Sequence, residues 1–256
     1  MRYRRGFIAL SDDRDIPMLL AIRNARAITC DQICTLLLNN GPENCKRSVH
    51  WRLARLEQNG LVERIDCGRL LSEPVFAITR SGLELLELRG HALISLPSTV
   101  KEIVRRSQVL HSVELAEICA ALTAAGVLKS WQWEIEVLSQ NLVYGGRCAK
   151  DFDALAEVSD GNRVRSFAIE FERTAKGSAR YSDLRKALST DNGVDTILYL
   201  TPDPSILYLL AAELRTVDKR IGFALSRAFR SSLLSTNVLT NASANDVVTF
   251  REFLFG

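Results

Sequence analysis

The chain has 256 residues, of which 47% are hydrophobic and 25% charged, values typical of a globular protein with a buried core. Its formal net charge of +3 permits nucleic-acid binding without indicating it. A run of about 18 uninterrupted apolar residues is missing from the sequence, which argues against a membrane-spanning helix. The apolar stretch near the N-terminus is too short for a signal peptide, so we expect a cytoplasmic protein.

Three helices are expected in the first 60 residues. Residues 15–26 carry apolar side chains at helical spacing. Thr29 and Gln32 have the spacing of a capping box, which predicts the start of a second helix. A third helix is expected over residues 44–60, between an Asn N-cap and an Asn-Gly C-cap. Helix, helix, turn and basic helix is the order of a helix-turn-helix.

The third helix has two contrasting faces. Val49, Leu53 and Leu56 form a narrow apolar stripe that can face a core. The remaining surface is rich in cationic and amide side chains, which suit the major groove of DNA. A solvated amphipathic helix is the alternative interpretation. The candidate DNA-binding residues of this helix are Lys46, Arg47, His50, Trp51, Arg52 and Arg55.

A two-stranded wing is expected after the basic helix. Residues 61–65 and 75–79 have strand patterns, with a turn after the first. Arg64 and Arg69 lie in or near the wing, where contacts to DNA phosphates are made. The segment from WRLARLEQNGLVERI to FAITRSGLELL resembles bacterial winged-helix regulators. We therefore predict a winged helix-turn-helix DNA-binding domain over residues 1–95 and a linker over residues 96–106.

Residues 107–256 are predicted to form an α/β domain with a central mixed sheet, so we expect an α+β protein in which this domain follows the winged helix. A strongly helical segment over residues 107–125 comes first. The strands that follow are expected at residues 131–138, 153–158, 164–172, 195–200 and 221–225, and the helices at residues 179–188 and 205–217. The apolar C-terminal residues could either close the core or form part of an interface; they are Phe250, Phe253, Leu254 and Phe255.

Residues 153–158 and 164–172 are joined by Ser159-Asp160-Gly161-Asn162, which predicts a hairpin. Three carboxylates are expected to meet on this hairpin. Asp153 begins one strand, whereas Glu170 and Glu172 end its partner and point to the same side because they are two residues apart. Hard oxygen ligands of this kind hold Mg²⁺, which polarises a phosphate and activates water. Asp153, Glu170 and Glu172 are therefore candidate metal ligands and catalytic residues. Alternatively, they merely end a strand and pair with Arg173 or Arg180.

The six cysteines do not include a CxxC pair. Cys30 and Cys34 share a helix face, so they could form a zinc cluster together with Cys45 and Cys67. Reduced cysteines that pack as small hydrophobes are more common in cytosolic proteins, and we favour that interpretation.

The carboxylate pattern resembles the core of the restriction-endonuclease-like, PD-(D/E)xK, superfamily. A winged helix fused to such a core is similar to the replication-relaxation family of bacteria, and the likeness extends over VLHSVEL, FDALAEV, FAIEFERTAKGSARYSDL and DTILYLTPD. Phe152 stands where the superfamily often has Pro, and Glu172 where it usually has Lys. Because this lysine is missing, we favour a non-catalytic domain; Lys176 and Arg180 are the nearest cations.

The resemblance implies a DNA-binding protein that acts in transcription regulation or as an accessory factor in plasmid replication or mobilisation. The winged helix would read double-stranded DNA without a cofactor, and the second domain would add dimerisation or further DNA contact. We expect a homodimer and no membrane partner. The alternative is a Mg²⁺-dependent DNA endonuclease that uses the winged helix for targeting.

Overall fold

The computed structural model describes residues 9–39, 41–68, 71–93, 106–144, 148, 150–241 and 247–256. The chain divides into two compact units, Met1–Ala124 and Ala125–Gly256. Each unit contains both helices and strands, and the second holds a mixed sheet. The predicted α+β class with a central mixed sheet is therefore confirmed.

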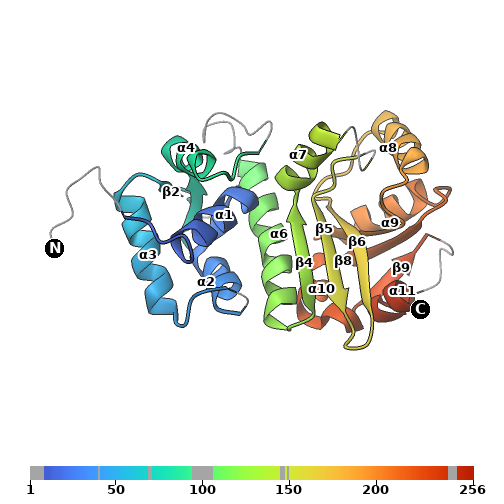
Figure 1. Cartoon of the computed structure of the whole chain (residues 1–256). Helices are drawn as coiled ribbons and strands as arrows, with labels where there is room; N and C mark the ends of the chain where they lie inside the picture. The colour runs from blue at the N-terminus through green and yellow to red at the C-terminus, as the bar shows by residue number, and fades with distance from the viewer. Residues whose placement is uncertain are drawn as a thin grey trace. The chain divides into compact units, whose positions relative to one another are not determined.

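The first unit is mainly helical with a small sheet (Figure 1). Its three strands pair antiparallel in the order β1-β3-β2. Its elements in chain order are α1 (Asp15–Ala25), β1 (Ile28–Thr29), α2 (Cys30–Asn39), α3 (Lys46–Gln58), β2 (Val62–Ile65), β3 (Val75–Ile78), α4 (Arg80–Leu88) and α6 (Arg106–Ala124).

Local signals set the ends of α2 and α3. The Thr29 backbone N–H donates to Gln32 Oε1 over 2.9 Å, and the Gln32 N–H donates to Thr29 Oγ1 over 3.3 Å, so the predicted capping box is confirmed. Helix α3 ends at Gln58 as the Asn-Gly pair predicted, with Gly60 at a φ of +69°. Its N-cap is Cys45 and not the preceding Asn44.

The core of the first unit confirms the apolar stripe of α3, because Val49, Leu53 and Leu56 are all buried. Helix α6 adds Val109 and Val113 to a cluster with residues of the small sheet. The Gln32 side-chain amide also donates to the Val113 carbonyl oxygen over 2.9 Å. Helix α6 therefore lies within the first unit, whereas the sequence-based boundaries placed residues 107–125 with the second.

The second unit is built on a seven-stranded sheet in the order β10-β9-β8-β7-β6-β5-β4. Strands β6, β7 and β8 are parallel, and the outer pairs are antiparallel. Its strands are β4 (Leu128–Trp133), β5 (Ala154–Ser159), β6 (Val164–Phe171), β7 (Thr196–Thr201), β8 (Arg220–Leu225), β9 (Asn237–Thr240) and β10 (Val247–Thr249). Its helices are α7 (Glu134–Tyr144), α8 (Ser178–Thr190), α9 (Pro204–Glu213), α10 (Ser226–Ser232), the 3-10 turn η1 (Leu233–Ser235) and α11 (Phe250–Phe255).

One predicted strand is partly wrong. Residues 131–138 were expected to be extended, but β4 ends at Trp133 and α7 begins at Glu134. The Glu136 carboxylate accepts a hydrogen bond from the Trp133 backbone N–H over 2.9 Å. Acidic side chains in a first turn favour a helix start, because the N-terminus of a helix carries partial positive charge.

The C-terminal residues close the core of the second unit. Phe250 and the three apolar residues at positions 253–255 are buried. The Phe250 ring lies 5.2 Å from that of Phe167 and 5.1 Å from that of Phe229, both in edge-on geometry. Of the two alternatives for this tail, the structure therefore favours core closure over an exposed interface.

Candidate functional site

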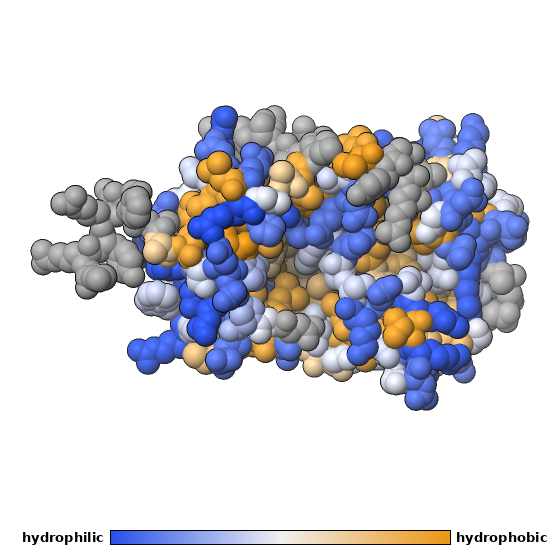
Figure 2. Space-filling view, viewed as in Figure 1, coloured by the Kyte–Doolittle hydropathy of each residue, from blue (hydrophilic) through white to orange (hydrophobic). Residues whose placement is uncertain are grey.

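Helix α3 presents a polar face to solvent. Figure 2 shows hydrophilic side chains over the part of the first unit where α3 lies. Trp51 stands on this face with 55% of its surface exposed. The spacings of three, one, three and four residues keep these positions on one side of the helix. Exposed residues of this face, here called the α3 face, are Arg47, His50, Trp51, Ala54 and Gln58.

Lys46, at the first turn of α3, is also exposed. Its Nζ atom lies 3.6 Å from a carboxylate oxygen of Asp31, and both side chains are more than half exposed. An ion pair so well solvated holds Lys46 only weakly, so its ammonium group can exchange this partner for another anion.

Arg52 and Arg55 are placed differently from the sequence-based expectation. Their side chains are only 13% and 14% exposed, and both pair with the Asp15 carboxylate, which is fully buried. Arg52 also lies 2.5 Å from Glu43, whose side chain is fully buried as well. Arg55 donates a second hydrogen bond to the Ala9 carbonyl oxygen over 3.1 Å. Both arginines turn back toward α1 and anchor α3, so they are not part of the α3 face.

The two predicted wing residues differ in what the structure says of them. Arg64 lies on β2 with its side chain 56% exposed, donates to the Glu57 carboxylate over 3.2 Å and stacks over the Phe76 ring. It is therefore accessible beside α3. Arg69 lies outside the described residues.

The carboxylate cluster forms at the base of the β5–β6 hairpin. Ala154 pairs with Ile169, so Asp153 and Glu170 occupy adjoining positions of neighbouring strands. The Asp153 carboxylate accepts a hydrogen bond from the Phe171 backbone N–H over 2.7 Å. The hairpin thus brings Asp153 to the end of β6, as the sequence predicted.

Two lysines pair with the glutamates of this cluster. Lys150 forms an ion pair with Glu170, and Lys176 forms one with Glu172. The two glutamates are buried, with 7% and 11% of their side chains exposed. Lys176 was named from the sequence, but Lys150 was not. The sequence shows Lys150 only as a cation three residues before Asp153. Its ion pair with Glu170 forms only because the chain that follows Lys150 pairs with β6.

Other groups of the protein contact all three carboxylates. Both glutamates already have a lysine partner, and Asp153 is held by a backbone N–H. Among the described residues, the three carboxylates are not a group whose oxygen atoms all approach one another within 4.8 Å. Mg²⁺ requires several oxygen ligands in close octahedral order. We therefore derive no catalytic step from this cluster.

Burial controls the chemistry of Glu170. Removal from water raises the pKa of this carboxyl group to about 7. The Lys150 cation opposes this shift, and the charge of Asp153 adds to it. The reverse holds for Lys150: burial lowers its pKa, but the charges of Glu170 and Asp153 outweigh this effect and raise it. The pair therefore behaves as one buried unit in which each charge depends on the other.

A family model described as Replication-relaxation matches residues 19–188. This span is well over half of the 256-residue chain and includes both α3 and the carboxylate cluster. The chain therefore belongs to the replication-relaxation family, as its sequence resemblance predicted. Comparison with curated proteins and with solved structures gave no match.

Family membership indicates a role in plasmid replication or mobilisation, and hence in processes that involve DNA. Every helix in the described part of the chain is too short or too polar to cross a membrane.

Proposed function

We propose that the protein binds double-stranded DNA through a winged helix-turn-helix in its first unit. The order of α1, β1, α2, α3, β2 and β3, with sheet order β1-β3-β2, supports this proposal. In a helix-turn-helix, the second helix of the motif lies in the major groove, and here that helix is α3. Strands β2 and β3 would form the wing, with Arg64 beside the DNA backbone.

The main support for the proposal is that α3 has two separate sets of polar side chains, one buried and one exposed. Arg52 and Arg55 anchor the helix through buried carboxylates, while Arg47, Trp51 and Gln58 point to solvent. Arg and Gln side chains form bidentate hydrogen bonds with guanine and adenine edges in the major groove. A basic helix that is fixed by ion pairs on its buried side suits the recognition of base edges.

Replacement of Arg47 by alanine tests the proposal. A double-stranded sequence is first selected from a random DNA pool with the full chain, and its affinity is then measured by fluorescence anisotropy. We expect R47A to weaken binding by about 1–3 kcal/mol, or about 5- to 150-fold, because one base or phosphate contact is lost. K129A, an exposed cation on β4, serves as the control. Equal affinity of R47A and the unaltered chain would contradict the role of α3.

We propose further that the second unit is non-catalytic. Support comes from the pairing of Glu170 and Glu172 with lysines, which leaves the carboxylates poorly suited to hold a metal ion. We expect supercoiled plasmid to stay intact when incubated with the protein and Mg²⁺ or Mn²⁺. Nicking that disappears in E170A, but persists in the exposed-residue variant E87A on α4, would establish the endonuclease alternative instead.

A homodimer in the cytoplasm stays a prediction from the function class, since winged-helix proteins commonly bind palindromic sites as dimers. The C-terminal tail, which offered one possible interface, is buried within its own unit. Symmetry in the selected DNA sequence, together with the mass of the complex, would test this point.

A further inference from the structure

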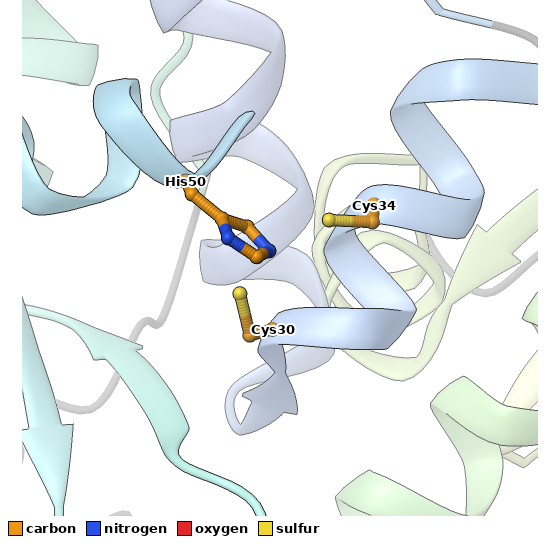
Figure 3. A group of neighbouring side chains, drawn as sticks. All are labelled: Cys30, Cys34 and His50. Carbon is orange, nitrogen blue, oxygen red and sulfur yellow. The ribbon is translucent and has the colours of Figure 1, made fainter. Parts of the chain in front are cut away.

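A group of three potential metal ligands lies between α2 and α3. Cys30 and Cys34 come from successive turns of α2, and His50 comes from α3 (Figure 3). Their side chains point toward one another, and one ligand atom from each lies within 4.8 Å of the others. Among the described residues, this is the one group of three Cys, His, Asp or Glu side chains with that geometry.

We propose that Cys30, Cys34 and His50 bind a zinc ion that links α2 to α3. Two thiolates and one imidazole form a ligand set that favours Zn²⁺ over Mg²⁺ or Ca²⁺, which prefer oxygen. The sequence-based cluster had Cys45 and Cys67 in place of the histidine. The structure instead assigns His50 as the third ligand, because α3 runs beside α2.

The three ligand atoms already lie close to the spacing that a zinc ion requires. Zn–S bonds of about 2.3 Å and Zn–N bonds of about 2.0–2.1 Å place the ligand atoms of a tetrahedral site roughly 3.3–3.8 Å apart. The three atoms here lie within 4.8 Å of one another, so small side-chain rotations bring them to a common ion. Cys34 is buried, Cys30 partly buried and His50 exposed, so the group runs from the protein interior to the surface.

An adjoining cavity of about 400 Å³ gives access to the group. Cys30 and His50 line it, together with the carboxylates of Asp31, Glu57 and Glu73. Arg64 is the one cation in this lining, and it is paired with Glu57. Lys46 lies 3.6 Å from Asp31, so Glu73 is the carboxylate of this lining for which no ion pair has been described. The lining as a whole is negative, which attracts a cation, and water from the cavity would supply the fourth ligand.

The site joins the two helices of the proposed helix-turn-helix. A zinc ion would fix the position of α3 relative to α2 and would hold the His50 ring away from DNA. Metal occupancy would therefore alter the affinity for DNA. This coupling rests on the proposed DNA-binding function, whereas metal binding itself does not.

Titration of the metal-free full chain with Co²⁺ tests the site without DNA. We expect one equivalent to produce the visible absorption of tetrahedral cobalt and a thiolate-to-cobalt charge-transfer band, and Zn²⁺ to displace both. C30S should weaken the charge-transfer band, and H50A should reduce Co²⁺ affinity at least tenfold while retaining a thiolate band. Neither residue is fully buried, so both variants are expected to fold, which circular dichroism verifies.

Cys45→Ser is the matched control, because Cys45 is an exposed cysteine next to α3 and outside the group. Its spectrum should equal that of the unaltered chain. Absence of the charge-transfer band, or its loss in C45S but not in C30S, would overturn the assignment. A change in DNA affinity of at least threefold between zinc-loaded and metal-free protein would support the coupling, and equal affinity would refute it. Failure of both forms to bind any DNA would count against the proposed function alone.

Discussion

Replacement of Asp15 by asparagine should destabilise the first unit by about 3–5 kcal/mol, the usual cost of removing one partner from a buried ion network. Asp15 is fully buried and is the shared carboxylate of Arg52 and Arg55. Its loss leaves two nearly buried guanidinium groups short of a counter-charge. Urea unfolding of the full chain, followed by circular dichroism, measures the effect on the transition of this unit.

D13N provides the control for this prediction, since Asp13 is an exposed acidic residue two positions away. We expect its unfolding free energy to lie within about 0.5 kcal/mol of the unaltered chain, as is usual for surface substitutions. A loss below about 1 kcal/mol in D15N would show that the network adds little to stability.

The same carboxylate predicts an acid dependence. Burial raises the pKa of Asp15, but hydrogen bonds from Arg55, the Ser11 backbone and Arg52 outweigh this and lower it overall. A lowered pKa in the folded state stabilises the protein above the ordinary aspartate pKa of about 3.9, and this stability is lost as pH falls through the folded value. D15N should therefore show a weaker loss of stability at acid pH.

Replacement of Lys150 by methionine should destabilise the second unit by about 3 kcal/mol. The Glu170 carboxylate is 7% exposed and would lose its cation, which is costly in a buried site. The double variant K150M/E170L removes both charges, and we expect it to regain most of the lost stability because an apolar pair needs no counter-charge. Unfolding in urea measures all three proteins.

Lys176 offers a matched comparison for this cycle. Its side chain is 32% exposed and pairs with Glu172 at i and i+4. Because solvent screens this pair more strongly, K176M should cost about 1 kcal/mol. If K150M costs no more than K176M, or if the double variant is as unstable as K150M, then the Lys150–Glu170 pair is not a buried ion pair of the kind inferred.

Local sequence patterns predicted those features that depend on neighbouring residues. The capping box of Thr29 and Gln32 and the buried stripe of Val49, Leu53 and Leu56 are both confirmed. Helical periodicity reports which side of α3 is buried, because that side must be apolar. The β5–β6 hairpin was predicted from its turn residues and its two strand patterns.

Local sequence patterns did not predict the partners of long charged side chains. Periodicity placed Arg55 on the polar face, but it reaches a carboxylate 40 residues away in sequence. Lys150 was missed because its partner Glu170 is 20 residues away and is reached only once the hairpin forms. Such pairings depend on tertiary packing, which no local window contains. The C-terminal strands β9 and β10 were missed for a related reason: they are short, and they form by pairing, β9 with β8 and β10 with β9.

The anchoring of α3 by Asp15 and Glu43 separates the stability of this helix from the chemistry of its outward side. The residues that fasten this helix and those that face outward are separate sets, since Arg52 and Arg55 belong to the former and Arg47 and Gln58 to the latter. Substitution of the outward residues leaves the buried ion pairs of the helix intact. Under the proposed function, a few substitutions on the outward side would change the preferred DNA sequence without a penalty in folding.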